Sequence, residues 1–155
     1  MNHYIIDGNN LIGRIKSFQQ LQKKDKQASR EKLVNLLNGY FAGKKIKLTL
    51  HFDGYPNLSL SVSKGKIEYS KNEISDNLIR REIESSKNPR LLILITSDHS
   101  LMNFGKVCGC TIISSDEFYK MIERSFDKND EEERIKQLNN DKSEFLKLFQ
   151  DRDRK

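Results

Sequence analysis

The stretch "LLILIT", residues 91–96, decides the fold class of this chain. A strand with one face in water alternates apolar and polar residues, whereas a strand covered on both faces is almost continuously apolar. The stretch therefore predicts a strand over Leu91–Ile95 inside a sheet that helices cover on both sides.

Segments of helical period alternate with four further short apolar runs on either side of this strand. The further strands are expected at Tyr4–Ile6, Ile46–Phe52, Ile67–Tyr69 and Thr111–Ile113. Helices are expected over residues 10–22, from Ser29 in "SREKLVNLLNGYF", within residues 102–109, and after the capping-box patterns "SKNE" (70–73) and "SSDE" (114–117). A hairpin around Lys64 and Gly65 is expected in "LSLSVSKGKIEYS". This alternation predicts a three-layer α/β/α fold with a mainly parallel five-stranded sheet.

The charge distribution divides the 155 residues into two parts. Residues 124–155 hold nine basic and nine acidic residues, so the whole net charge of +6 falls on residues 1–123. A basic body favours a polyanionic partner, nucleic acid first. We predict one folded domain over 1–123 and a charged helical C-terminal extension over 124–155. The extension carries one sparse apolar stripe: Ile135, Leu138, Phe145, Leu146 and Phe149.

Several classes of protein and site are disfavoured. The sequence has no apolar run of about 18 residues and no basic-then-apolar leader pattern, so we expect a cytoplasmic protein without a membrane partner. It contains no phosphate-binding glycine loop and no G-x-S-x-G turn. Cys108 and Cys110, in "CGC", are expected to be small residues near a strand start rather than a disulfide or a zinc site.

Aspartates follow four of the five expected strands: Asp7, Asp53, Asp98 and Asp116. The carboxyl ends of parallel strands lie at one edge of the sheet, so these acids are expected to gather there. Asp76 joins them from the first turn of a helix. Turn or cap chemistry explains any single one of these residues, Asp116 most fully, and Asp76 could simply pair with Arg80. The coincidence of Asp7, Asp53, Asp76 and Asp98 favours a shared site.

Several carboxylates at one edge repel one another unless a proton or a cation intervenes. Carboxylate oxygens suit Mg²⁺ or Mn²⁺, and a basic body suits a phosphate-bearing substrate. The pattern therefore predicts metal-assisted cleavage of a phosphodiester by an activated water. Glu82 lies almost two helical turns further from the edge than Asp76 and ranks lower. His51 and His99 could touch substrate, but partly exposed structural histidines are the expectation.

Five motifs, "YIIDGNNLI", "HFDGYP", "EISDNLIRREIE", "LITSD" and "GCTIISSDEF", resemble the NYN domains of the PIN-like nuclease superfamily, and most of all the bacterial YacP-like branch. The resemblance covers about residues 1–122. It implies an endoribonuclease whose acidic cluster binds Mg²⁺ or Mn²⁺. It implies metal ligands at Asp7, Asp76 and Asp98, with Asp53 as a further catalytic acid. That branch is associated with ribosomes and mRNA cleavage, so the ribosome is a further candidate partner beside RNA.

Substrate-binding residues are expected near the same edge. The resemblance implies that Asn10 supports Asp7 or the substrate, and it sets Ser97 beside Asp98. The other candidates are four cations and one aromatic residue: Arg14, Lys16, Arg80, Arg81 and Tyr55, the last as a surface on which a base could stack. Two alternatives stay open: a non-catalytic RNA-binding or adaptor module on the same fold, and a phosphatase or nucleotide hydrolase acting on small molecules.

Overall fold

Five strands form one sheet in the order β3-β2-β1-β4-β5, and every neighbouring pair is parallel. The computed structural model describes the backbone of residues 1–153 and the side chains of residues 1–140, 142 and 146. The strands are β1 (Asn2–Asp7), β2 (Ile46–Phe52), β3 (Gly65–Tyr69), β4 (Leu92–Ile95) and β5 (Thr111–Ile113). The helices are α1 (Gly8–Arg14), α2 (Lys16–Lys24), α3 (Lys26–Phe41), α4 (Ser75–Ser85), α5 (His99–Cys108) and α6 (Ser115–Asp153), with a short 3-10 helix, η1, at Pro89–Leu91.

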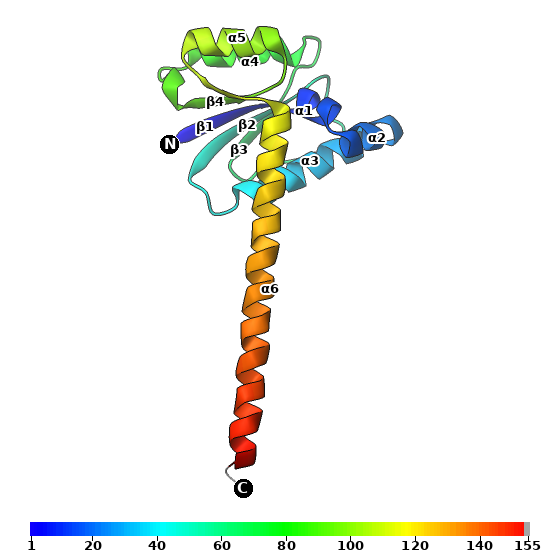
Figure 1. The fold of residues 1–155 in the computed structure, drawn as a ribbon. Helices are drawn as coiled ribbons and strands as arrows, with labels where there is room; N and C mark the ends of the chain where they lie inside the picture. The colour runs from blue at the N-terminus through cyan, green and yellow to red at the C-terminus, as the bar shows by residue number, and fades with distance from the viewer. Residues whose placement is uncertain (154–155) are drawn as a thin grey trace. The chain divides into compact units, whose positions relative to one another are not determined.

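The sheet lies between two helical layers. Successive residues of a strand point to opposite faces, and β1 shows what covers each face. Tyr4 contacts the ring of Phe41 in α3, with ring centroids 4.8 Å apart. Ile5 belongs to a buried cluster with Ile79 of α4 and Leu101 of α5. Helices α4 and α5 thus cover one face and α1–α3 the other (Figure 1), which confirms the three-layer α/β/α prediction.

The first turns of α6 complete the core on the α3 face. Phe118 is fully buried. Its ring stacks on Phe41 at 6.1 Å between centroids and meets Tyr40 edge-on at 5.6 Å. Ser114 caps the helix as its capping-box pattern predicts, since its hydroxyl oxygen accepts a hydrogen bond of 3.2 Å from the Glu117 amide. This packing holds the segment after β5 beside the sheet.

Two helix starts differ from the sequence predictions. The helix expected over 10–22 is two helices, because the chain is extended at Ile15 and buries that side chain. The capping box expected at "SKNE" is wrong: the Ser70 hydroxyl accepts from the Gly54 amide at 3.0 Å, and α4 begins only at Ser75. The cause of both differences is the same: contacts with distant parts of the chain outweigh the helix signals of the local sequence.

Two further helices begin at an aspartate that the sequence patterns did not assign as a cap. Asp25 caps α3 in place of Ser29, whose hydroxyl donates to the Lys26 carbonyl at 2.7 Å. The helix expected within 102–109 already begins at His99, because Asp98 caps it. Aspartate accepts a hydrogen bond from a first-turn amide as readily as serine does.

The predicted hairpin around Lys64 and Gly65 is wrong. Residues 57–64 form no strand, and β3 runs parallel to β2 with Gly65 opposite Leu48. A Cβ on Gly65 would lie 1.7 Å from the Leu48 carbonyl oxygen. Only glycine therefore allows the chain to pass this close to β2 before β3 begins.

The chain divides into two compact units, residues 1–119 and the remainder from Lys120. In the second unit α6 continues as one helix, and its stripe residues Ile135, Leu138 and Leu146 are exposed. Phe145 and Phe149, also assigned to the stripe, lie outside the described side chains. The boundary at 123/124 stays a prediction. Within residues 1–153, no helix is both long and apolar enough to cross a membrane.

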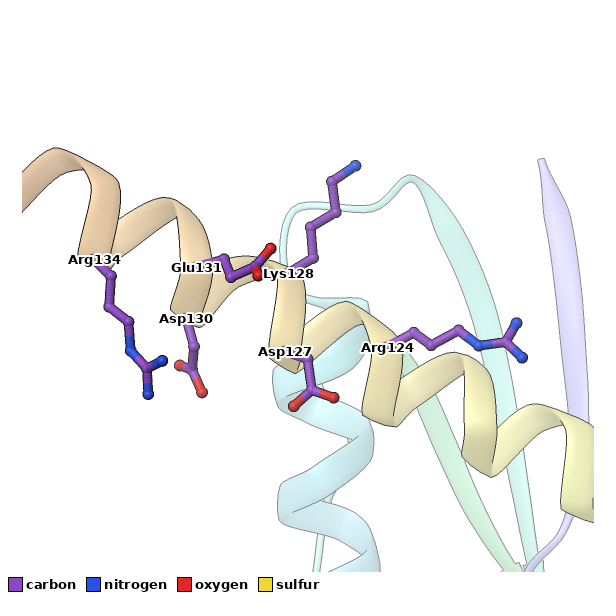
Figure 2. A pocket seen from close by; sticks show the side chains of 6 residues that line it. All are labelled: Arg124, Asp127, Lys128, Asp130, Glu131 and Arg134. Carbon is purple, nitrogen blue, oxygen red and sulfur yellow. The ribbon is translucent and has the colours of Figure 1, made fainter.

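A hollow on the second unit is lined only by charged side chains of α6: Arg124, Asp127, Lys128, Asp130, Glu131 and Arg134. Figure 2 shows Asp127, Asp130 and Arg134 pointing to the same side of the helix and Lys128 to the opposite side. Mixed charges at helical spacing are typical of a solvated helix face. The residues with site chemistry lie instead in the first unit.

Candidate functional site

The strand order reverses between β1 and β4, and this place determines where a ligand would bind. From β1 the chain builds outward through β2 and β3, then returns to β4 on the other side of β1. In parallel sheets, ligands bind beyond the carboxyl ends of the strands at such a reversal. Asp7 ends β1, and Thr96, Ser97 and Asp98 follow β4. The reversal therefore brings the first and fourth strand ends together.

A single hydroxyl connects these two strand ends. Thr96, which is fully buried, donates a hydrogen bond of 3.1 Å to Oδ2 of Asp7 and accepts one of 3.2 Å from the Asp98 amide. Asp7 also caps α1 through a bond from the Asn10 amide, and Asp98 caps α5 through the Leu101 amide at 2.9 Å. Both carboxylates thus lie at helix N-termini, where the helix dipole favours negative charge.

Asp7 carries a charge that its surroundings disfavour. Its pKa is raised from 3.8 to about 6, chiefly by desolvation and to a smaller extent by the nearby carboxylate of Asp53. Hydrogen bonds from Asn10 and Thr96, together with His51, act in the opposite direction but do not compensate. A carboxylate that is costly to ionise, near a second acid in a candidate crevice, is a typical feature of functional sites.

Asp53 is held at the end of β2 by three other segments. Its Oδ1 accepts from both the amide and the hydroxyl of Ser75, at 2.8 and 2.7 Å. Its own amide donates to Oδ1 of Asn9 at 2.8 Å. Its carbonyl accepts from Arg30 at 2.6 Å. Ser75 is the first residue of α4, so its bonds to Asp53 fix where that helix begins. They therefore also fix the position of Asp76, the next residue of the helix.

Asp76 and its neighbour Arg80 form the pair that their spacing suggested. Arg80 Nε lies 2.7 Å from Oδ2 of Asp76, and the same guanidinium donates to the Ser100 hydroxyl at 2.8 Å. It also lies over the Phe104 ring, 4.8 Å from its centroid. Arg80 therefore links α4 to α5 and balances the charge of Asp76.

Asn10 ties together the loops around the site. Its side-chain oxygen accepts from the Ser97 amide at 2.9 Å and from the Ser115 hydroxyl at 2.8 Å. The Ser97 hydroxyl oxygen in turn accepts from the Ser115 amide at 3.0 Å. Asn10 is thus a connecting residue between β1, β4 and α6, while Asp7 caps the helix. The substrate-binding roles of Asn10 and Ser97 stay predictions.

The basic residues expected to bind substrate are partly engaged with acids. Arg14 pairs with Asp116 at 2.7 Å, and Arg81 pairs with Glu73 at 2.6 Å. Asp116 thus lies in a helix first turn as expected, but Ser114 is the residue that caps that helix. Lys16 is exposed at the first residue of α2. Both ion pairs are exposed, where such pairs contribute little and exchange easily with a phosphate.

A buried polar cluster lies beneath α4. His51 is 2% exposed, so the expectation of a partly exposed histidine is wrong. Its Nε2 lies 3.0 Å from Oε2 of Glu82, and the same carboxylate lies 3.5 Å from His3. His3 also bonds the Thr49 hydroxyl at 2.7 Å. Glu82, assigned low rank as a site acid because of its distance from the edge, instead anchors the helix of Asp76 to β1 and β2.

Replacing Glu82 with glutamine is expected to destabilise the fold by about 1–2 kcal/mol, because the hydrogen bonds to a charged partner are lost or weakened. Burial alone would raise the pKa of Glu82, but His51 and its other partners lower it overall. Its contribution is therefore present above the ordinary value of 4.5 and lost as pH falls below it. Urea unfolding at pH 7 and pH 4 measures both effects. The exposed Glu84→Gln on the same helix is the control; equal stability of both variants would contradict the anchor.

The carboxylate oxygens at this edge of the sheet are the kind of ligand that a divalent cation prefers, although they do not surround a single position. Hydrogen bonds use Oδ1 of Asp53, Oδ1 of Asp98 and Oδ2 of Asp76, and the second oxygen of each makes none within the part of the chain that is described. Across the described part of the chain, no three His, Cys, Asp or Glu side chains are grouped so that they could hold a metal ion. Mg²⁺ is commonly held by one or two carboxylates, with water and substrate phosphates completing its shell.

Comparison with known proteins agrees with this architecture. The family model for the YacP-like NYN domain matches residues 4–154. This chain belongs to the YacP-like NYN domain family. The match confirms the resemblance seen in the motifs and runs beyond residue 122 into α6. The family is one of the PIN-like nuclease superfamily, so the chain is a nuclease-type domain with an RNA-related function.

Solved structures show the same fold. The crystal structure of Rae1 (YacP) from Bacillus subtilis matches with a TM-score of 0.69 and 20% sequence identity, covering 97% of this chain and 93% of that one. Its W164L mutant matches with a TM-score of 0.67 and 20% identity, covering 80% of this chain and 76% of that one. No curated protein sequence matches the chain.

Two features of the site have no sequence signal of their own. Arg30 and Ser75 both bond Asp53. In the sequence, however, Arg30 looks like an ordinary helix residue, and Ser75 follows the capping-box pattern expected at 70–73 without any feature of its own. Thr96 had a weak signal, since it directly precedes Ser97 and Asp98. A polar residue directly after a continuously apolar strand is the pattern that indicates such a residue.

Proposed function

We propose that this protein is a metal-dependent endoribonuclease that cleaves RNA phosphodiester bonds by in-line attack of water. The observation that carries the proposal is Asp7: a desolvated carboxylate at the strand-order reversal, joined through Thr96 to the segment of Asp98. Family membership supports the nuclease class and RNA as the partner. We further propose that the reaction takes place in the cytoplasm.

The acids divide into holding and positioning roles. Asp7, Asp76 and Asp98 would hold Mg²⁺ or Mn²⁺, with Asp53 beside Asp7. When bound, such an ion supplies a more acidic water and neutralises charge on the phosphate. Thr96 orients Asp7 by donating to one of its oxygens. Arg14, Lys16 and Arg81 supply positive charge for the RNA backbone at the surface.

A non-catalytic RNA-binding module on the same fold is the second candidate. Two observations favour it: within the described residues the acids are not gathered into a three-ligand group, and Arg80 already pairs with Asp76. Such a module would bind RNA, release it as salt rises, and leave it intact.

The deciding experiment is cleavage of a labelled single-stranded RNA with Mg²⁺ or Mn²⁺, compared with EDTA and with Asp98→Asn. We expect products only from the wild-type protein with metal. Binding without cleavage under every metal condition would favour the second candidate. Cleavage that survives both EDTA and Asp98→Asn would contradict the metal-dependent mechanism.

A further inference from the structure

An aromatic ring stands in a fixed position beside Asp53. Tyr55 is 55% exposed, although its hydroxyl donates a hydrogen bond of 2.6 Å to Oδ1 of Asn72. An exposed tyrosine on a loop ordinarily has freedom to change rotamer. The bond to Asn72 restrains this ring at its far end while leaving much of its surface open.

The backbone beneath the ring is held from inside the protein. Arg30 of α3 is 3% exposed. One of its terminal nitrogens donates to the Tyr55 carbonyl at 2.9 Å, and the other donates to the Asp53 carbonyl at 2.6 Å. Its guanidinium also lies over the rings of Phe52 and Tyr69. A single rigid fork thus sets the position of Tyr55 relative to Asp53.

A second loop is joined to the first and carries backbone strain. Lys71 has φ +59°, a left-handed conformation that is uncommon for a residue other than glycine. Its amide donates to the Gly54 carbonyl at 2.8 Å, and the Gly54 amide donates to Ser70 at 3.0 Å. Strain of this kind persists where surrounding contacts over-determine a conformation, often at ligand clamps.

An exposed apolar side chain and a cation lie on the segments that contact Asp53 and Gly54. Ile74, exposed at the start of α4, directly precedes Ser75, which binds Asp53. Lys26 Nζ lies 3.9 Å from the position that a Cβ on Gly54 would take. Proteins commonly bind an unpaired nucleotide with an aromatic ring that stacks on the base and a nearby cation that contacts the phosphate backbone of the nucleic acid.

We propose that Tyr55 is a stacking platform for one unpaired base of single-stranded RNA next to the Asp53 end of the site, with Lys26 facing the phosphate backbone and Arg30 as a positioning residue. This inference rests on the proposed function and specifies its substrate further. A base in a duplex is stacked on both sides, so it has no free face for the ring. The platform therefore selects RNA that is single-stranded at this nucleotide.

The test measures binding of a fluorescein-labelled RNA of about 10 nucleotides, within the usual range of single-strand site sizes. The full chain is used in EDTA, so that affinity is measured apart from cleavage. Tyr55→Ala is expected to weaken binding by about 5- to 100-fold, the range for losing one base–aromatic stack. Tyr55→Phe keeps the ring but loses its bond to Asn72, so it is expected to weaken binding much less than Tyr55→Ala does. Leu58→Ala, at another exposed side chain of this loop, is expected to bind like the wild-type protein. The same sequence as a duplex should bind Tyr55→Ala and wild-type protein equally.

Equal affinity of Tyr55→Ala and the wild-type protein would overturn the platform. A loss in Tyr55→Phe as large as in Tyr55→Ala would overturn it too, because the hydroxyl would then be what matters. Wild-type protein that binds this RNA but does not cleave it with Mn²⁺ would contradict the proposed function alone, and the comparison of variants would still decide the platform. Wild-type protein that binds no RNA would overturn both.

Discussion

Replacing Asp7 with asparagine is expected to lower RNA cleavage by at least about 100-fold, a typical loss when a charged group at the reacting centre is removed. Asparagine keeps the shape and can still cap α1, because its side-chain oxygen accepts from the Asn10 amide as Oδ1 of Asp7 does. What disappears is the negative charge at the strand-order reversal, together with the acceptor for the Thr96 hydroxyl. The loss should therefore appear in cleavage and not in folding.

The same substitution is expected to stabilise the metal-free protein at pH 7. A carboxyl whose folded pKa is raised from 3.8 to about 6 lowers the free energy of unfolding as pH rises through that window. At pH 7 the penalty is at most about 3 kcal/mol, at 1.36 kcal/mol per pKa unit. Asparagine has no charge to desolvate, so its advantage should vanish below about pH 4.

Thermal unfolding in EDTA at pH 7 and pH 4, beside cleavage at pH 7 with Mn²⁺, measures both halves. Mn²⁺ should also raise the midpoint of the wild-type protein and not of Asp7→Asn, because a ligand stabilises only the state that binds it. Asp25→Asn is the matched control, since Asp25 also caps a helix through its side chain but does not end a strand. Full cleavage by Asp7→Asn would remove Asp7 from the mechanism.

A methyl group added at Gly8 is expected to destabilise the fold by about 3 kcal/mol, at the upper end for overpacking a core. A Cβ there would lie 2.6 Å from the His51 carbonyl oxygen and 2.8 Å from the Phe52 ring. Neither neighbour can yield easily, since one is strand backbone and the other is a buried ring. The displaced chain would carry Asp7 with it, so cleavage should fall as well.

Gly13→Ala provides the control for Gly8→Ala. Gly13 belongs to the same short helix, and a Cβ there meets nothing within 4 Å. Alanine at an open helical position is neutral or stabilises by up to about 1 kcal/mol. Urea unfolding of the two variants measures the difference. Equal stabilities would show that the approach of Gly8 to β2 is looser than its geometry indicates.

Much of the fold could be predicted because its signals are local. The continuous apolar run at 91–95 marks a doubly covered strand, and β4 lies at Leu92–Ile95 beside β1. The wrong predictions occur where contacts with a distant segment of the chain outweigh the local sequence signal. Ser70 looks like a helix cap but binds Gly54, and Gly65 looks like a turn but passes against Leu48. Neither partner can be identified from nearby residues.

The site divides in the same way. Asp7 ends its strand and Asp98 follows its strand by three residues, so their place at one edge follows from a parallel sheet alone. Their partners do not follow. Asn10 bonds Ser97 and Ser115, which are 87 and 105 residues later in the chain. Spacing along the sequence contains no information about bonds of this range, and it likewise gave no reason to expect Arg30 behind Asp53.

The Asn10 bonds have a consequence for the order in which the protein is made. Asn10 is synthesised 105 residues before Ser115, so its side-chain oxygen has both partners only once Ser115 has been added. Until then the loop after β1 lacks the bonds that hold it against the loops after β4 and β5. A nascent chain that stops short of α6 carries all four aspartates, Asp7, Asp53, Asp76 and Asp98, without the assembled edge. Cutting activity is therefore expected to appear only after the start of the last helix is in place.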